Sequence, residues 1–393
     1  MPPGPWPAGA YRIAVRVLVA PDKFRGTLAA DEAARAIGAG WRRERPEDVL
    51  AELPVADGGE GTLQVIAEAL GGHLEERSVT GPLGDPIRAA FGLVDRSGGT
   101  TGLVELASAS GLNLVGERRE PMRASTRGTG ELILAACRAG AREVIVFLGG
   151  SASTDGGAGI AMAVGARLLR EDGRSIPDGG EGLRELATID ISSVDPAVRA
   201  ARIVAACDVA SPLLRIGGAA RVYAPQKGAS AEQVLVLERA LGHLAAVIQR
   251  DLAIDLRDTI GAGAAGGAAA GLVAFLGAHL RRGTDLVFEA VAFEEALASS
   301  DLLVTGEGRF DASSLAGKVV GAAIERARRF GVPALVLCGE AETIEPGVLG
   351  TGVEVRSLVD LVGAERARTG ASTALAELAS RAAAARSHLS SAP

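Results

Sequence analysis

The sequence predicts a doubly wound α/β protein in which one parallel-sheet domain is divided along the chain and a second α/β domain is inserted into it. Apolar runs and helical periodicities alternate at both ends of the chain, which is typical of βαβ units. Of the 393 residues, 48% are hydrophobic but only 3% are aromatic. A core built on Ala, Val, Leu and Ile suits a parallel sheet covered by Ala-rich helices.

The N-terminal part contains two strand–helix pairs. Residues 16–20 (RVLVA) form a short apolar run that ends at a proline, and residues 28–43 carry apolar side chains at helical spacing. A second strand at 48–57 is followed by a helix at 63–72 that glycine closes. The order is strand, helix, strand, helix.

The same order returns near the C-terminus. Strands are expected at 301–308, 334–340 and 353–360. A helix is expected at 319–331, and an Ala-rich terminal helix begins at Ser372. Two strands at the front and three at the back would complete one five-stranded parallel sheet.

The middle of the chain then forms the inserted domain. We expect the divided domain to span 12–75 and 285–393 and the inserted domain to span 76–284. Residues 1–11 read as a disordered Pro- and Gly-rich tail. The strands of the inserted domain are expected at 102–106, 142–150 and 201–208.

The charge and composition exclude several classes of protein. The net charge is −7 without a long basic run, so a nucleic-acid partner is not expected. No run of about 18 apolar residues could span a membrane, and the N-terminus lacks the pattern of a signal peptide. Three scattered cysteines and four scattered histidines predict neither a disulfide framework nor a zinc site. The sequence therefore predicts a soluble cytoplasmic protein.

Acidic residues gather in Gly-rich turns where the predicted strands end. Ligands of open α/β sheets bind beyond the carboxyl ends of the strands. Carboxylates beside glycines suit a site shared by Mg²⁺, which takes oxygen ligands, and phosphate, which takes backbone N–H groups. Any one of these residues could equally cap a helix, whereas five such strand ends together favour a site. The residues are Asp22, Asp57, Glu60, Asp155, Asp208, Glu307 and Asp311.

Two Gly-rich stretches have the composition of phosphate loops. GGSASTDGGAG at 149–159 lies between a predicted strand and a predicted helix, where backbone N–H groups can form an anion nest, but the chain contains no Walker sequence GxxxxGK[ST]. GAGAAG at 261–266 matches GxGxxG letter for letter. It lacks a preceding strand and a suitably placed acidic residue, so close helix packing is the expected reason for its glycines.

Few basic residues lie close to these turns in the sequence, namely Lys23, Arg25, Arg127, Lys227, Arg309 and Lys318. Lys318 follows GRFDASSLAG at the start of a predicted helix, where it could reach a phosphate or be an ordinary solvated lysine. Arg127 lies in ASTRGTGE among Ser125, Thr126 and Thr129, and this set could bind a small polyhydroxy or carboxylate substrate.

Nine stretches follow one another as in one known family. They are APDKFRGTLAADEAARAI, PVADGGEGT, GPLGDP, ASTRGTGELI, GGSASTDGGAG, CDVASPL, APQKGAS, GAGAAGG and TGEGRFDASSLAGK. From about residue 16 to residue 340 the chain resembles the bacterial, two-domain glycerate kinase family. The resemblance implies ATP-dependent phosphorylation of D-glycerate with Mg²⁺. It also implies a flavodoxin-like domain that is divided by an inserted α/β domain.

Six positions depart from the pattern of that family. An Asn-to-Ser change removes an amide, and a Lys-to-Arg change keeps the charge but not the geometry, so the departures bear on substrate detail more than on reaction type. Lys23 and Arg25 stand where a Ser/Lys pair is usual, Thr154 and Ser211 each replace an Asn, Arg215 stands where Gly is common, and Ser313 replaces a Gln.

Loop position and chemistry suggest a role for each candidate residue. We expect glycerate to bind in the cleft between the domains, with its carboxylate held by Arg127 or Lys23. Asp57, with Asp208 as the second choice, would take the proton of the acceptor hydroxyl. Lys318 would neutralise the charge that develops on the phosphate. The remaining expected contacts are Ser125, Thr126 and Thr129 with glycerate, Gly150, Ser151, Ser153 and Asp155 with ATP phosphates or glycerate, and Glu307 and Asp311 with Mg²⁺.

Three questions stay open at this point. The sequence does not decide between 2-phosphoglycerate and 3-phosphoglycerate as the product, although the family's sugar-acid catabolic members suggest the 2-hydroxyl. A kinase of another small hydroxy acid and a non-catalytic binding protein remain as alternatives. The oligomeric state, monomer or homodimer, is also undecided.

Overall fold

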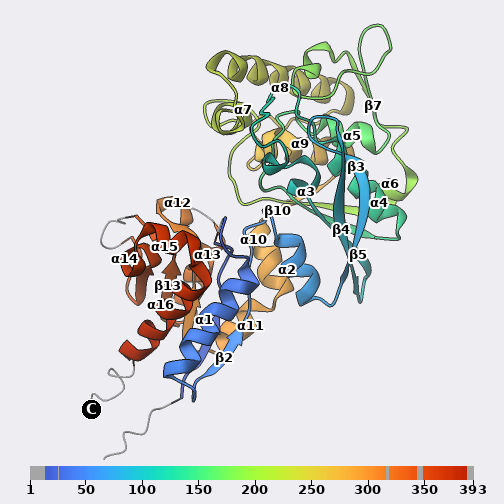
Figure 1. The fold of residues 1–393 in the computed structure, drawn as a ribbon. Coiled ribbons are helices and arrows are strands. Elements are labelled where there is room, and N and C mark those ends of the chain that lie inside the picture. Colours follow the sequence, from blue (N-terminus) through green and yellow to red (C-terminus); the bar gives the residue numbers. More distant parts are fainter. Residues whose placement is uncertain (1–13, 25, 316–317, 343–347, 387–393) are drawn as a thin grey trace, which may run out of the picture. The chain divides into compact units, whose positions relative to one another are not determined.

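The computed structural model describes residues 14–24, 26–315, 318–342 and 348–386 (Figure 1). Arg25 and the predicted tail at 1–11 lie outside the described residues. The chain divides into two compact units, which we describe separately. Unit 1 comprises the residues up to Ala56 and from Ala292 onward, and unit 2 comprises Asp57–Val291.

Unit 1 is built on one five-stranded sheet in the order β15-β13-β11-β1-β2, and all of its pairings are parallel. Numbered within the unit, this is the order 2-1-3-4-5 of flavodoxin-like sheets. The prediction that two front strands and three back strands form one sheet is confirmed. The strands are β1 (Arg16–Val19), β2 (Val49–Glu52), β11 (Leu302–Thr305), β13 (Ala334–Cys338) and β15 (Val353–Ser357), and a small pair of β12 (Arg309–Phe310) and β14 (Glu340–Ala341) lies apart from them.

Helices complete the core of unit 1. The first helix buries an apolar stripe at helical spacing that includes Ala33, Ile37 and Trp41, each 0% exposed. The terminal helix was expected from Ser372, and Leu375 and Leu378 are its buried anchors. The helices are α1 (Ala30–Glu44), α11 (Phe293–Ala298), α12 (Ala312–Leu315), α13 (Val319–Arg329), α14 (Leu358–Val362), α15 (Ala364–Thr369) and α16 (Ala371–Arg386).

The first and last helices of unit 1 lie side by side, as the blue and red helices in Figure 1 show. They approach closely at Gly40, where an added Cβ would lie 2.0 Å from the backbone oxygen of Ala376. Only glycine permits this distance, because a backbone oxygen cannot move aside without moving its helix.

We expect Gly40→Ala to lower the free energy of unfolding by about 1–3 kcal/mol, as overpacking does in other cores. Gly242 offers a matched control, because it also lies inside a helix but no atom of the described residues lies within 4 Å of its added Cβ. Gly242→Ala should raise stability by about 1 kcal/mol through helix propensity. Chemical denaturation of both variants measures the contrast, and a Gly40→Ala protein as stable as the wild type would contradict the close packing.

Unit 2 contains a six-stranded mixed sheet in the order β10-β9-β6-β5-β4-β3. The pairings from β10 to β5 are parallel, and those of β5 with β4 and of β4 with β3 are antiparallel. The three predicted strands are present as β5, β6 and β9. The strands are β3 (His73–Thr80), β4 (Pro86–Arg96), β5 (Gly99–Glu105), β6 (Glu143–Phe147), β9 (Arg202–Ala206) and β10 (His279–Arg281), with a separate hairpin of β7 (Arg167–Leu169) and β8 (Thr188–Asp190).

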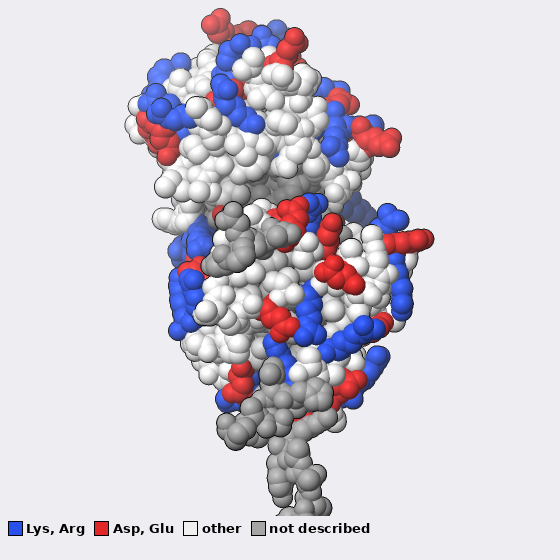
Figure 2. Space-filling view, turned by 90° about the vertical axis from the view of Figure 1, so that its left-hand side faces the viewer, with Lys and Arg blue, Asp and Glu red and all other residues white. Residues whose placement is uncertain are grey.

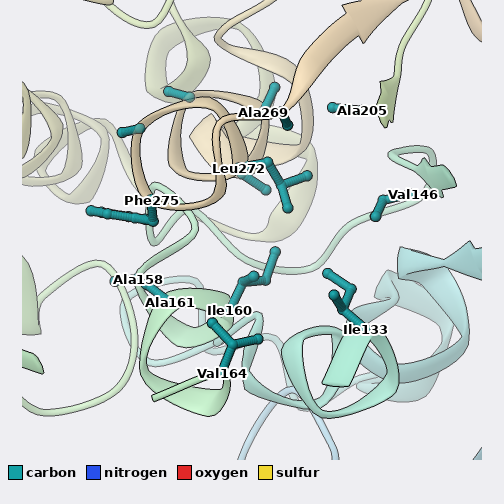
Figure 3. Packing of buried hydrophobic residues seen from close by; sticks show 14 of the residues in the cluster. Ile133, Val146, Ala158, Ile160, Ala161, Val164, Ala205, Ala269, Leu272 and Phe275 are labelled. Atoms are coloured by element: carbon teal, nitrogen blue, oxygen red, sulfur yellow. The ribbon is translucent and has the colours of Figure 1, made fainter. Parts of the chain in front are cut away.

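The core of unit 2 is aliphatic, as the low aromatic content predicts. Figure 3 shows Ile160, Leu272 and Ile133 from three different helices packed together, with Val146 and Ala205 from the sheet nearby. The helices are α2 (Thr62–Ala69), α3 (Leu106–Ser110), α4 (Arg127–Arg138), α5 (Ala158–Ala163), α6 (Pro196–Ala200), α7 (Ala219–Tyr223), α8 (Ala231–Leu252), α9 (Ala264–Leu276) and α10 (Gly283–Ala290), with 3-10 helices η1 (Leu112–Leu114), η2 (Gly182–Glu185) and η3 (Pro225–Lys227).

The division between the units falls at different residues from the predicted domain bounds. The sequence placed the first bound after residue 75 and the second before residue 285, whereas the compact units divide at Ala56/Asp57 and Val291/Ala292. The reason is that α2 and α10 pack against each other, and α2 also packs against β4 and β5. Both helices therefore belong to unit 2.

Acidic and basic side chains are interspersed over the face shown in Figure 2. Within the part of the chain that the structure describes, no helix combines the length and the apolar character needed to cross a bilayer.

Candidate active site

In unit 1 the strand order reverses between β1 and β11, which is the point where open α/β sheets bind ligands. The segments that follow these strands stay side by side, because Asp22 N donates to Gly306 O at 2.8 Å. Asp22 is buried, and its Oδ1 accepts the N–H of Lys23 at 2.7 Å. Two predicted site residues, Lys23 and Glu307, therefore follow the two strands at this switch point.

A linked chain of polar side chains lies between β12 and α13. Lys318 Nζ donates to Ser313 Oγ at 2.8 Å, and that hydroxyl donates to Asp311 Oδ1 at 2.5 Å. The hydrogen bond from Ser313 is the largest influence on the pKa of Asp311, which lies below its ordinary value. The structure thus brings Asp311 and Lys318 together, and Ser313, one of the six departures, is the residue that joins them.

The donor set of unit 1 fits Mg²⁺ that is shared with a nucleotide. Glu307, which is 8% exposed, and Asp311 supply carboxylate oxygens, the ligands that Mg²⁺ takes together with substrate phosphates. Among residues 14–386, apart from the stretches that the structure does not describe, no group of three or more His, Cys, Asp or Glu side chains could hold a metal ion.

Asp57 begins a turn that lies at the carboxyl end of β6 in unit 2. Gly149 N, two residues after β6, donates to Gly58 O at 3.1 Å. Gly59 N donates to Asp57 Oδ1 at 3.0 Å. The fold thus places the turn that carries Asp57 beside the beginning of the 149–159 loop.

Glu105 holds the other end of this turn, and the sequence analysis did not single it out. It is the last residue of β5, it is 4% exposed, and its Oε2 accepts Gly61 N at 3.1 Å and Leu63 N at 3.2 Å. The carboxylate caps α2 at its N-terminus. Glu105 could have been identified from the sequence, because it lies at the end of the predicted strand 102–106.

Asp208 follows β9 and accepts hydrogen bonds from Thr284 at the start of α10. Thr284 N lies 3.1 Å from both carboxylate oxygens, and Thr284 Oγ1 donates to Oδ1 at 2.9 Å. Burial raises the pKa of Asp208, against these hydrogen bonds. An added Cβ at Gly58 would lie 3.8 Å from Asp208 Oδ2, so the carboxylate also faces the turn of Asp57. Asp208 therefore caps a helix and lies close to the proposed base.

Asp155, expected to contact a ligand, is instead enclosed by the protein. It is 0% exposed, and it accepts Thr126 N and Thr126 Oγ1 at 2.8 Å, Gly159 N at 3.2 Å and Gly157 N at 3.3 Å. Burial raises the pKa of Asp155, and these donors oppose the rise. The carboxylate caps α5 and joins the 149–159 loop to the start of α4, so its role in this structure is to hold the loop.

The hydroxyls of the 149–159 loop also point inward. Ser153 and Thr154 are 0% exposed, and among the residues that the structure describes their hydroxyls have no hydrogen-bond partner, whereas Ser151 Oγ accepts the Nζ of Lys227 at 2.8 Å. Gly150 is the exposed residue among the four expected ligand contacts of this loop. Lys227 is one of the basic residues near these loops in the sequence but was not a predicted site residue, because its burial depends on segments far away in the chain.

The GAGAAG stretch packs against the backbone of the 149–159 loop, whereas the sequence predicted close packing between helices. An added Cβ at Gly266, which has φ +67°, would lie 2.2 Å from the backbone oxygen of Ser153. Gly156 N donates to Gly266 O at 3.1 Å. The glycines therefore serve close backbone packing, and the prediction that this stretch is not a dinucleotide loop is consistent with its place.

Arg127 and its neighbouring hydroxyls make contacts within unit 2. The guanidinium donates to both carboxylate oxygens of Asp178, each at 2.9 Å. Ser125 Oγ accepts Arg127 N at 3.2 Å, and Thr129 Oγ1 lies 2.8 Å from Ser110 Oγ. The structure thus brings Arg127 and its neighbouring hydroxyls together. The Arg127 guanidinium, however, which was expected to hold a substrate carboxylate, is already paired with Asp178.

Two further departures have partners in the structure. Ser211 Oγ lies 2.9 Å from the hydroxyl of Tyr223. Arg215, which has φ +82°, pairs with Asp258. Arg215 stands where glycine is common in the family, and its left-handed backbone is the conformation that glycine adopts readily.

A 2-1-3-4-5 parallel sheet defines a flavodoxin-like α/β protein, a class that binds its ligands at the switch point of the sheet. The model of the glycerate kinase family matches residues 17–387. A glycerate kinase of Bacillus subtilis is 44% identical, with 86% of this chain and 89% of that protein covered. The glycerate 2-kinase of Escherichia coli is 43% identical, with 83% and 85% covered.

A solved structure agrees with these relatives. The crystal structure of a Salmonella typhimurium LT2 protein assigned as glycerate kinase 2 matches with a TM-score of 0.81 at 40% identity, covering 95% of this chain and 99% of that one. The chain belongs to the glycerate kinase family.

Proposed function

We propose that this enzyme transfers the γ-phosphoryl group of ATP to the 2-hydroxyl of D-glycerate and releases ADP and 2-phosphoglycerate. The observation that carries the proposal is the turn of Asp57, which the fold holds at the carboxyl end of β6 within reach of Asp208. A carboxylate at a strand end is suitably placed to accept the proton of an acceptor hydroxyl. The names of the relatives support glycerate as the acceptor and the 2-hydroxyl as the position.

In the proposed reaction the residues of this chain accept a proton, stabilise the charge on the transferred group and hold Mg²⁺. The glycerate hydroxyl oxygen forms a bond to the γ-phosphorus, the bond from that phosphorus to the β–γ bridging oxygen breaks, and Asp57 takes the hydroxyl proton. Lys318 stabilises the negative charge on the transferred group, since phosphoryl transfer depends mainly on positioning and charge neutralisation. Asp311 keeps Lys318 in place through Ser313. Mg²⁺ bound by Glu307 and Asp311 would neutralise nucleotide phosphates.

Lys23 is the better candidate of the two for the substrate carboxylate. Arg127 already forms a bidentate pair with Asp178, and replacing that partner by a substrate would require the pair to break. Lys23 lies at the switch point, where ligands of open sheets bind.

Phosphorus NMR of the product made from ATP and D-glycerate tests activity and position together. We expect one product with the resonance of 2-phosphoglycerate, and ADP formation in equal amount. 3-Phosphoglycerate would overturn the position. Faster turnover of tartronate or hydroxypyruvate than of D-glycerate would overturn the substrate, and nucleotide binding without ADP formation would overturn the reaction.

A further inference from the structure

Lys227 is a buried lysine in a chain that almost always uses arginine. Three of the 41 basic residues are lysines, namely Lys23, Lys227 and Lys318. Arginine presents a wide planar fork of donors, whereas lysine presents a compact charge with three donors. A lysine therefore suits a position where a small cation must fit among closely spaced acceptors.

The surroundings of Lys227 are of this kind. The residue ends η3 and is 3% exposed. Its Nζ donates to Ser151 Oγ at 2.8 Å and to the backbone oxygen of Ser153. The ammonium group thus joins η3 to two alternate residues of the 149–159 loop.

A buried carboxylate of opposite charge lies in the same loop. Asp155 acts on Lys227 by Coulomb attraction. The donors to Asp155 include three backbone N–H groups and the hydroxyl of Thr126, whose oxygen accepts Ile160 N. These donors stabilise the ionised form of the carboxylate and oppose burial, which raises its pKa. The loop is therefore held by two enclosed groups, a cation at Ser151 and Ser153 and an anion at 155.

The loop is also connected to the proposed base. Ser151 lies two residues after Gly149, whose N–H donates to Gly58 O at 3.1 Å. Gly59 N in turn donates to Asp57 Oδ1 at 3.0 Å. A shift of the loop at Ser151 would move the backbone donor that fixes the turn of Asp57.

We propose that Lys227 is a positioning residue of the kinase reaction, whose ammonium group holds the 149–159 loop and, through Gly149 and Gly58, the position of Asp57. The inference rests on the proposed role of Asp57 in phosphoryl transfer. Because Lys227 is enclosed by the protein and donates to Ser151 and Ser153, its loss should lower kcat rather than raise KM for ATP. A misplaced catalytic group reduces turnover steeply.

The charge state of Lys227 provides a readout that packing alone would not produce. Burial lowers the pKa of Lys227 to about 7, and Asp155 opposes this effect. Arg119 is a further charged group next to η3, and its exposed guanidinium donates to Gln226 O at 3.1 Å. Tyr223, on α7 before η3, is also titratable. Loss of the proton above neutral pH removes the charge that complements Asp155.

NMR can observe this proton directly, because protein labelled with ¹⁵N at lysine Nζ has three such side chains. The signal that disappears in Lys227→Met belongs to Lys227. We expect it to titrate near pH 7, far below the ordinary value of 10.5. A Lys227 signal that titrates near 10 would overturn the enclosed state of this ammonium group.

Kinetics test the positioning role. We expect Lys227→Met to lower kcat by about 10- to 100-fold with KM for ATP changed less than about 3-fold, and Lys227→Arg not to restore kcat. Arg119→Met is the matched control, since it removes a cation that contacts η3 from the solvent side. It should keep kcat within about 2-fold of the wild type.

The wild-type protein provides a test without any substitution. Its kcat should fall at alkaline pH with the apparent pKa of the Lys227 NMR signal. Titration of Lys227 does not itself unfold the protein, because a lysine whose folded pKa lies below its unfolded value makes the folded state bind fewer protons, so the contribution of this group to stability rises between about pH 7 and pH 10. A kcat that stays constant while Lys227 titrates would overturn the inference. Absence of any glycerate phosphorylation would instead overturn the proposed function.

Discussion

Asp57→Asn is expected to lower kcat for D-glycerate by about 10²- to 10³-fold, because the amide cannot take the proton of the acceptor hydroxyl. The asparagine side-chain oxygen can still accept Gly59 N, which lies 3.0 Å from Asp57 Oδ1, so the turn should keep its shape. A coupled assay of ADP release measures kcat, and the thermal midpoint should stay close to that of the wild type.

Glu60 in the same turn is the matched control for this substitution. Its Oε2 accepts the side-chain amide of Asn113 at 2.6 Å in an exposed position. Glu60→Gln should therefore change kcat by less than about 3-fold. If Asp208→Asn lowered kcat far more than Asp57→Asn in a folded protein, the base would be Asp208. If both Asp57→Asn and Lys318→Ala kept near-normal turnover, the proposed mechanism would be wrong.

The largest expected effect on stability comes from Asp48, which lies in an enclosed cluster of unit 1. Its carboxylate accepts Arg45 Nε at 2.6 Å, Trp41 Nε1 at 2.9 Å and Val15 N at 3.0 Å. The Arg45 and Asp48 side chains are 3% and 0% exposed. Asp48→Ala would remove the closest counter-charge of a buried guanidinium and leave only the more distant Glu47 Oε1 at 3.7 Å, and we expect a loss of about 3–5 kcal/mol in the free energy of unfolding.

Urea denaturation of the full chain measures this loss, and Asp31→Ala provides the control. Asp31 pairs with Arg35 on the exposed side of the same helix, where a salt bridge contributes less than about 1 kcal/mol. A loss below 1 kcal/mol for Asp48→Ala would contradict the proposed importance of the cluster. The double variant Arg45→Met/Asp48→Leu should recover much of the stability, because it removes both charges.

The pH dependence of this cluster has a definite direction. Burial acts to raise the pKa of Asp48, but the hydrogen bonds from Arg45, Trp41 and Val15 outweigh it, so the pKa lies below its ordinary value. The carboxylate therefore contributes stability above its unfolded pKa of about 3.9, and that contribution is lost as the pH falls through the lower folded value.

The alternation of apolar runs with helical periodicity was sufficient to predict the sheet of unit 1. Parallel strands buried on both faces appear in a sequence as continuous apolar runs, and RVLVA and ALVLC are both of this kind. The bounds of the units were less predictable. Whether α2 belongs to one unit or the other depends on its packing against β4, β5 and α10, which no local pattern contains.

For the candidate site, too, some properties could be predicted from the sequence and others could not. The sequence by itself determined that carboxylates stand at the ends of several strands, because residue type and strand position are local properties. Only the tertiary structure decided that Asp155 is enclosed by Thr126 and the start of α5, that Arg127 pairs with Asp178, and that Lys227 reaches the 149–159 loop. The physical reason is that a side chain's partners and its exposure to water come from segments tens of residues away. A Gly-rich loop of the same composition can therefore be a ligand cradle or an internal support.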